Sequence, residues 1–379
     1  MIESLFFELL QVSIGRRVTL HHCPTGKQWA ELFQMAKKQA LVGVTASAIE
    51  RLPQEQRPPK SLMQQWAILT VQVEQQNQWL NAKCAEVTEF LQQEGFDTCI
   101  LKGQGMAQRY PNPLRRQSGD IDVWVMEKQY RSDIDQVIKD IQQIFPHARF
   151  RYHHADIEAK LQRNEQGQLI CLTEIKEGEK RDAIEIHFRP SYSLSPFRNF
   201  RMQRWFTTYK KFQRTSLGFF VPSHSFNAVY ILSHIFRHLF DEGIGLRQIL
   251  DYYYVIQACA SLSCREKELI NQTLRRMGLY SFCQAIMYVL HRVMGLPQEA
   301  MITKMNEKKG RFVLDEIMMA GNFGHYDSRV QHGNRTKWDW FVLKQKRSIR
   351  FFSYFPEESL SSPYYNIYQY LWRWRRGFL

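Results

Sequence analysis

Two aspartates one residue apart are the strongest chemical signal in this sequence. Asp120 and Asp122 lie in the run over 119–125, whose apolar residues predict a buried β-strand. Because side chains alternate along a strand, the two carboxylates share one face, opposite Ile121 and Val123. Adjacent like charges repel and resist desolvation, so the pattern favours a cation between them, and oxygen ligands on a strand suit Mg²⁺. The alternative is a solvated strand end with two surface aspartates.

A glycine turn and a basic loop precede that strand. A short β-prone run ends in Lys102-Gly103-Gln104, and a helix is expected to follow directly. Glycine at such a turn lets backbone N–H groups approach an anion, and a new helix N-terminus adds its positive dipole end. The proline-containing loop that comes next carries Arg115 and Arg116 toward the aspartates. This order predicts a binding site for a phosphate-bearing ligand.

The ordered set of strand, glycine turn, basic loop and acidic strand resembles the nucleotidyltransferase superfamily with the polymerase-beta-like fold. More narrowly, it is similar to the bacterial family of uncharacterised nucleotidyltransferases. The resemblance implies that Gly103 forms the glycine turn and that Asp120 and Asp122 are the paired metal ligands. It also implies a third carboxylate on a later strand, for which Glu185 is the best match.

The strand that carries this third carboxylate is predicted by alternation over 183–190. Glu185, His187 and Arg189 share one face there, with apolar side chains on the other. An exposed glutamate on an edge strand is the structural alternative. Other carboxylates that could take the third position are Asp156, Glu158, Glu174 and Asp182.

One departure from the superfamily concerns the turn itself. The usual sequence there is Gly-Ser, whereas Gln104 follows Gly103 in this chain. The hydroxyl contact to the phosphates is therefore missing, and phosphate binding is expected to depend on Lys102 and on backbone amides, with Arg115 and Arg116 as further cations.

The activity that the resemblance implies is transfer of a nucleotide from a nucleoside triphosphate, with pyrophosphate leaving. Two Mg²⁺ or Mn²⁺ ions about 4 Å apart would bind the attacking and departing oxygens. The acceptor stays unknown and includes polyanions such as RNA or a phosphorylated sugar. Two alternatives remain open, namely an inactive nucleotide-binding or sensing module and an RNA- or membrane-associating protein that acts through its basic C-terminal region.

A second group of polar residues follows on two expected helices. His234, Arg237 and His238 share one face of the first, and Arg247 and Asp251 lie on the second. We interpret the group as positioning nucleotide or acceptor, because it resembles a motif of the same family. A metal half-site and hydrogen-bonded core histidines are the alternatives.

The fold class predicted from these patterns is α+β, with a small mixed-sheet core between two helical regions. The expected divisions are a helical region over 1–96, the catalytic core over 97–192 and a helical domain over 193–379. The expected strands cover 97–101, 120–126, 148–153, 155–162, 168–175 and 182–189, with helices over 104–110 and 127–143.

Composition bounds the setting of the protein. The 379 residues carry a formal net charge of +14, and no apolar run approaches the 18 residues of a membrane span. Seven scattered cysteines without a C-x-x-C pair favour a reducing compartment, so we expect a cytoplasmic protein. Basic and aromatic residues concentrate at the C-terminus, which either packs on the core or binds a polyanion or an anionic membrane. Oligomeric state and nucleobase leave no pattern.

Overall fold

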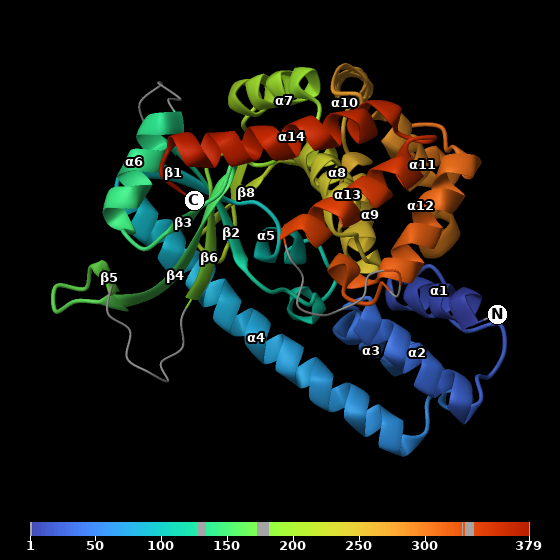
Figure 1. Cartoon of the computed structure of the whole chain (residues 1–379). Coiled ribbons are helices and arrows are strands. Elements are labelled where there is room, and N and C mark those ends of the chain that lie inside the picture. The colour runs from blue at the N-terminus through green and yellow to red at the C-terminus, as the bar shows by residue number, and fades with distance from the viewer. Residues whose placement is uncertain (1, 128–133, 173–181, 328, 330–336, 379) are drawn as a thin grey trace.

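A mixed β-sheet flanked by helices makes up the fold (Figure 1). The structure is a computed structural model that describes residues 2–127, 134–172, 182–327, 329 and 337–378. The α+β class predicted from the sequence is confirmed. The strands of the described sheet are β1 (Phe96–Ile100), β2 (Ile121–Glu127), β3 (Arg149–Phe150), β4 (His154–Arg163), β5 (Leu169–Leu172) and β6 (Asp182–His187).

The strand order is β1-β2-β6-β4-β3, with β5 paired to β4. Only the pairing of β2 with β6 is parallel among the described strands, and all other ladders of this sheet are antiparallel. Each expected strand matches an observed one, although β3 is only two residues long. Residues 128–133 of the expected helix, residues 173–175 of the expected strand and the rival carboxylate Glu174 lie outside the described residues.

The helices before the sheet end in one long helix. They are α1 (Ile2–Ser13), α2 (Gly26–Lys38), α3 (Val42–Arg51) and α4 (Lys60–Gln93). The last of these buries Trp66, Leu80, Cys84 and Leu91, which recur at helical spacing along one face. Figure 1 shows α4 running from beneath the N-terminal helices to the sheet, where it leads into β1.

The remaining helices follow or interrupt the strands. Within the first half lie the single turn α5 (Gln104–Ala107), the 3₁₀ turn η2 (Pro113–Arg115) and α6 (Ile134–Ile144). After the sheet come α7 (Pro196–Thr208), a strand pair β7 (Phe212–Arg214) and β8 (Phe220–Pro222), α8 (His224–Asp241), α9 (Leu246–Cys259), α10 (Cys264–Arg276), α11 (Tyr280–Met294), α12 (Glu307–Ala320), α13 (Lys337–Phe351) and α14 (Pro356–Arg375).

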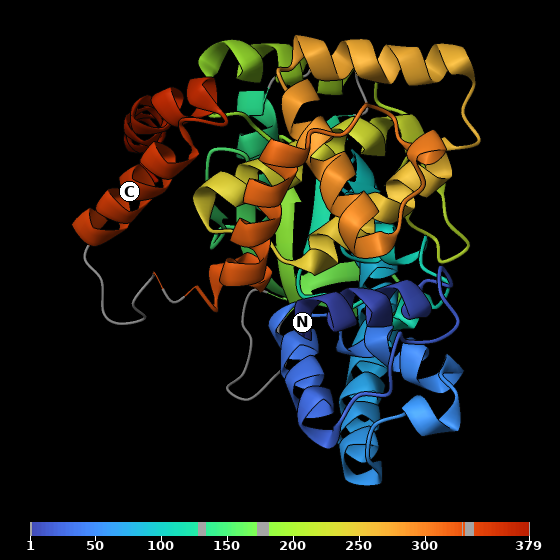
Figure 2. The ribbon, with the colours of Figure 1, turned by 90° about the vertical axis from the view of Figure 1, so that its right-hand side faces the viewer.

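Helix α8 is the central element of the C-terminal helices. Its residues from Phe226 to Phe240 are all buried, and the hydroxyl of Ser223 caps its N-terminus by accepting from Phe226 N. The N-terminal helices reach the same body, because Gln11 of α1 donates a hydrogen bond to Val293 O of α11 at 3.1 Å. Figure 2 shows these first helices beneath the C-terminal ones.

Helix α14 closes the fold over the sheet. The rings of Tyr365 and Trp372 pack edge-on against Tyr152, which lies between β3 and β4, with centroids 5.9 and 5.6 Å apart. The outer face of this helix leaves Tyr364 and Trp374 exposed. None of the described helices combines the length and apolar composition that crossing a bilayer needs.

Candidate active site

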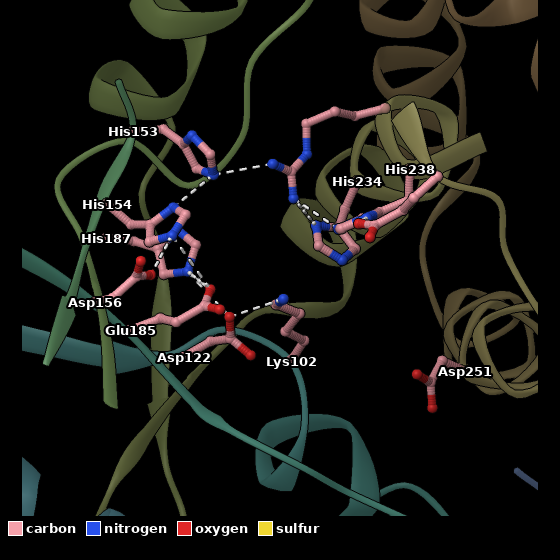
Figure 3. Close-up of polar contacts among 12 residues, drawn as sticks. Lys102, Asp122, His153, His154, Asp156, Glu185, His187, His234, His238 and Asp251 are labelled. Carbon is pink, nitrogen blue, oxygen red and sulfur yellow. Dashed lines mark hydrogen bonds and ion pairs between the residues drawn. The ribbon is translucent and has the colours of Figure 1, made fainter. Parts of the chain in front are cut away.

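The register of two parallel strands brings Asp122 and Glu185 side by side. They are direct partners in the ladder between β2 and β6, so both side chains leave the same face of the sheet. His187 Nε2 lies 3.0 Å from Asp122 Oδ1 and 3.3 Å from Glu185 Oε2 (Figure 3). The ligand atoms of these three residues all lie within 4.8 Å of one another. This spacing allows one cation to contact both carboxylates.

The glycine turn adds an ammonium to the two carboxylates. Lys102 Nζ lies 2.8 Å from Asp122 Oδ1, and Leu101 N donates to Asp122 O at 2.9 Å, which ties the end of β1 to β2. Gly103 has a φ of +52°, and a Cβ there would lie 3.4 Å from Asp120 O. That backbone conformation strains any residue with a side chain, so the turn requires glycine.

Asp120 comes directly before β2 and is half-buried. Its side chain lines the same cavity as Lys102 and Asp122. It does not belong to the group of three ligand atoms formed by Asp122, Glu185 and His187. Both aspartates therefore line the cavity, but only Asp122 belongs to the cluster with Glu185 and His187.

A small cavity lies beside these residues. Its walls come from the glycine turn, the start of β2, α8, α9 and the ring of Phe323. The predicted site residues that line it are Lys102, Gly103, Arg116, Asp120, Asp122, His234, Arg247 and Asp251. The fold thus brings residues that lie up to 149 positions apart in the sequence, Lys102 and Asp251, to one cavity.

The charges of the cluster support one another. Burial disfavours ionisation of Asp122, but the Lys102 ammonium and His187 together outweigh it and lower the pKa of this carboxyl. Burial opposes ionisation of Glu185 as well, yet the hydrogen bond from His187 lowers its pKa to about 2. For His187 itself, burial lowers the pKa, and the hydrogen bonds to both carboxylates more than restore it. Both carboxylates are therefore ionised at neutral pH.

His187 is fully buried and does not face the cavity. The sequence predicted a role in positioning substrate for it. The structure instead places its Nε2 between the two carboxylates. His187 therefore contacts both carboxylates and does not line the cavity.

Arg116 and Asp251 form a closed ion pair. The guanidinium donates from Nε to Oδ1 and from NH2 to Oδ2, both at 2.7 Å, and Tyr110 donates its hydroxyl to Oδ1 at 2.7 Å. All three side chains are buried. Because this bidentate pairing uses the fork of the guanidinium, Arg116 has little capacity left for a phosphate. The expected roles in phosphate binding and substrate positioning are not supported for this pair.

Two other predicted phosphate ligands lie away from the cavity. Arg115 pairs with Glu50 at 2.6 Å and Glu74 at 2.8 Å, which belong to α3 and α4. The buried side chain of Gln104 donates to Asn77 O at 3.1 Å. The short α5 also replaces the expected helix over 104–110, and one turn has little dipole to offer an anion.

The histidine and arginine group on α8 and α9 divides into two parts. Arg237 NH2 contacts His238 Nε2 at 2.7 Å and His234 Nδ1 at 3.4 Å, and its NH1 contacts His153 Nε2 at 2.9 Å (Figure 3). These residues form one network between α8 and the start of β4. Of them, only His234 reaches the cavity.

Arg247 is buried at the cavity like Arg116, but it is not paired with a carboxylate of the described residues. Its NH1 donates to Gln117 O at 2.5 Å, and the guanidinium lies 5.4 Å from the centroid of Phe323. No carboxylate of the described residues forms an ion pair with it, and its buried Nε has no hydrogen-bond partner. Burial, together with the neighbouring Arg116, lowers its pKa to about 10. An anion in the cavity would relieve this cost.

Sequence reasoning missed His153 and His154, which join the polar face of the sheet from β4. His154 pairs with His187 across the antiparallel ladder of β4 and β6. The adjacent pair of histidines at the start of an alternating strand was the available signal. Only the register, which sequence alone does not give, places it beside Glu185. The rival carboxylate Asp156 lies opposite Glu185 in the same ladder.

Comparison with known proteins identifies a family for this chain. A family model described as "Uncharacterised nucleotidyltransferase" matches residues 25–295. The chain belongs to this family. The match spans the glycine turn, both acidic strands and helices α8 and α9, and ends before Phe323.

Likeness to individual proteins is weak for this member of the nucleotidyltransferase family. A crystal structure of an antigenic nucleotidyltransferase-like protein from Paracoccidioides brasiliensis is similar at 12% identity and a TM-score of 0.35. That alignment covers 60% of this chain and 94% of the fungal one. No curated protein matches the sequence.

Proposed function

We propose that the protein transfers a nucleoside monophosphate from a nucleoside triphosphate to an acceptor hydroxyl or phosphate, with release of pyrophosphate. The observation that carries the proposal is the pairing of Asp122 with Glu185 on neighbouring strands beside Lys102. Membership of a nucleotidyltransferase family supports the reaction class. The nucleobase and the acceptor stay open, and RNA or a phosphorylated sugar are candidates for the latter.

The donor set fits divalent cations such as Mg²⁺ or Mn²⁺. Asp122 and Glu185 offer ionised oxygens close together, and Asp120 adds a carboxylate from the cavity wall. Hard oxygen ligands of this kind are what these ions prefer. We propose that the three residues hold two ions, which when bound would stabilise the charge that develops on the attacking and departing oxygens.

The cationic side chains of the cavity would hold the triphosphate. Lys102 contacts Asp122 through one ammonium, with 15% of its side chain exposed, so it can turn toward a phosphate once a cation shares that carboxylate. Arg247 lacks a carboxylate partner among the described residues and lines the same cavity from α9. Gly103 lets the backbone approach the ligand without a side chain between them. We assign triphosphate binding to these residues rather than to Arg115 and Arg116.

The acceptor would approach from the side of Glu185. Its side chain is 27% exposed, whereas that of Asp122 is 1% exposed. An acceptor oxygen arriving from solvent therefore meets Glu185 first. His187 would keep this carboxylate fixed through its proton on Nε2. The resulting order is triphosphate at Lys102 and Arg247, then Asp122, then Glu185 and the acceptor.

Free thiols favour a reducing compartment for this reaction. All seven cysteines are unpaired, and we propose that the protein works in the cytoplasm, where nucleoside triphosphates are available.

A second candidate function rests on the C-terminal helix. Exposed aromatic rings such as Trp374 and Tyr368 alternate with Arg375 and Arg376 around a groove between α14 and α6. Aromatic and basic side chains together suit a single-stranded polyanion. Binding of RNA or an anionic membrane through this surface, with an inactive nucleotide site, is the alternative to transfer.

The test is incubation of the protein with each α-labelled nucleoside triphosphate, Mg²⁺ or Mn²⁺ and cell extract, followed by a search for the labelled product. Wild type should transfer label, Asp122→Asn should not, and Arg375→Gln combined with Arg376→Gln should transfer as wild type. Equal labelling by Asp122→Asn would contradict the proposal. If only the arginine variant lost the function of the protein, binding of RNA or an anionic membrane through the C-terminal helix would be the better explanation.

A further inference from the structure

The polar face of the sheet continues from β6 onto β4, beyond the residues assigned to nucleotide transfer. Across this antiparallel ladder Asp156 lies opposite Glu185 and His154 lies opposite His187. His154 Nε2 is 2.8 Å from Asp156 Oδ1 and 3.9 Å from Glu185 Oε2 (Figure 3). The ligand atoms of His154, Asp156 and Glu185 all lie within 4.8 Å of one another.

Hydrogen bonds behind His154 decide which of its nitrogens carries the proton. Arg237 NH1 contacts His153 Nε2 at 2.9 Å, and because a guanidinium only donates, this nitrogen accepts. His154 Nδ1 lies 2.7 Å from the same nitrogen of His153, and we infer that it carries a proton and shares the one lone pair of this nitrogen with the guanidinium. In the neutral ring the other nitrogen, Nε2, then presents a lone pair.

That lone pair points at two carboxylates. Nε2 of His154 faces Asp156 Oδ1 at 2.8 Å, a hydrogen-bond distance at which neither neutral imidazole Nε2 nor carboxylate has a proton to give. Two acceptors at this distance repel unless a positive charge lies between them or beside them. A cation bound by both atoms removes this repulsion, and the carboxylate of Glu185 offers it a third ligand.

We propose that His154, Asp156 and Glu185 form a binding site for a divalent transition-metal ion of the Zn²⁺ and Mn²⁺ class. The imidazole nitrogen distinguishes this site from the all-oxygen set of Asp120 and Asp122, because imidazole suits transition metals and Mg²⁺ takes oxygen ligands. Separations of 2.8 and 3.9 Å between ligand atoms bracket the spacing of about 3.4 Å expected around a tetrahedral ion with bonds near 2.1 Å.

The surroundings of the three ligands match those of known metal sites. Ligating histidines usually donate their second nitrogen to a neighbour, as His154 Nδ1 does to His153. Ligating carboxylates are usually hydrogen-bonded in turn, and Arg151 Nε donates to Asp156 Oδ2 at 2.8 Å. The side chains of Asp156 and Glu185 are 21% and 27% exposed, so ions and completing water molecules can reach the site.

The site adjoins the proposed nucleotide site but does not depend on it. Glu185 is common to both, with Asp122 and Lys102 on one side and His154 on the other (Figure 3). An ion at His154 would lie on the side from which the acceptor is proposed to approach. It would therefore add positive charge where an acceptor oxygen or phosphate arrives.

The experiment is a Co²⁺ titration of the metal-free full-length protein without nucleotide, followed by visible absorption, with Zn²⁺ as competitor. We expect wild type to bind Co²⁺ with the absorption bands of nitrogen and oxygen ligation. His154→Gln and Asp156→Asn should each weaken binding by more than about 100-fold, since changes to mere supporting groups already cost about 10–100-fold. His147→Gln is the matched control, because His147 is an exposed histidine on the chain just before β3, and it should bind as wild type.

Circular dichroism and thermal melting of each variant separate loss of metal from loss of fold. Unchanged Co²⁺ affinity in folded His154→Gln would overturn the proposal, as would absence of Co²⁺ binding by wild type. Nucleotide labelling in Mg²⁺ alone is read separately with Asp122→Asn. A failed Co²⁺ experiment with intact labelling, or the reverse, therefore shows which of the two proposals is wrong.

Discussion

Two buried aspartates at the same cavity differ in how completely they are paired. Asp251 is held by both arms of the Arg116 guanidinium and by the hydroxyl of Tyr110. Asp122 is held at one oxygen by the ammonium of Lys102 and by His187. The first arrangement uses rigid, bidentate donors and leaves no role for a ligand. The second leaves a carboxylate beside Glu185 that a cation can share.

Residue type and burial do not distinguish these two aspartates. Both aspartates are at most 4% exposed and both line the cavity. What separates them is whether their partners can be exchanged. The same distinction applies to Arg116, which is fully paired, and Arg247, which has no carboxylate partner among the described residues.

The largest effect is expected on the rate of nucleotide transfer when Asp122 is replaced. Asp122→Asn should lower nucleotide transfer by at least about 1,000-fold, because bound metal ions supply several kcal/mol of transition-state stabilisation. Its thermal midpoint should stay within a few degrees of wild type. Rates come from the labelling assay and midpoints from circular dichroism. Nucleotide transfer by Asp122→Asn at a tenth of the wild-type rate or more would contradict a catalytic role for Asp122.

The next effect separates them by stability. Asp251→Asn should lower the free energy of unfolding by about 3–5 kcal/mol, because it leaves the buried Arg116 without its partner. Urea denaturation measures this directly, with Asp122→Asn as the matched substitution. A loss of unfolding free energy below about 1 kcal/mol would show that the ion pair of Arg116 and Asp251 does not stabilise the fold.

A smaller effect sharpens the contrast between arginines. Arg247→Gln should raise the KM for the nucleoside triphosphate by about 10–100-fold, since a hydrogen bond to a charged group contributes about 1.5–3 kcal/mol. The free energy of unfolding should not fall, because the native guanidinium has no carboxylate partner to lose among the described residues. Arg115→Gln is the control, because its partners Glu50 and Glu74 lie away from the cavity. An equal rise in KM for Arg115→Gln would contradict the assignment.

The smallest effect is a pH dependence of stability that comes from Glu185. Its folded pKa of about 2 lies below the ordinary value of about 4.3, so ionised Glu185 stabilises the folded state. That contribution is complete above the ordinary pKa and is lost as the pH falls toward 2. The difference in unfolding free energy between wild type and Glu185→Gln should therefore shrink between pH 5 and pH 3. If this difference in unfolding free energy grew as the pH fell, the lowered pKa of Glu185 could not be its cause.

The acidic strands could be predicted because their signals are local. Alternation around Asp122 and Glu185 gave both strands and the face that each carboxylate occupies. The class of protein followed from the order of these elements with the turn at Gly103, and the family match agrees. What local signals cannot give is the pairing of strands. The approach of His154 to Glu185 depends on β4 lying next to β6.

The arginines show a second limit of sequence reasoning. Arg115 and Arg116 are neighbours in one loop, and the sequence offered both as phosphate ligands. In the structure one pairs with α3 and α4 and the other with Asp251 on α9. Adjacent side chains leave the backbone in different directions, so their partners are decided by whichever helices pack on each side. Arg247 lines the cavity together with Asp251 of the same predicted group, but that no carboxylate of the described residues pairs with it is visible only in three dimensions.

The central claim is that cations bound by Asp122 and Glu185 hold a nucleoside triphosphate at this cavity. The most direct measurement is anomalous diffraction from crystals grown with Mn²⁺ and a triphosphate analogue that cannot be cleaved at the α-phosphorus. We expect manganese within about 2.5 Å of oxygens from both carboxylates, with the triphosphate extending toward Lys102 and Arg247. Nucleotide and manganese bound elsewhere, with the Lys102 contact to Asp122 intact, would contradict it.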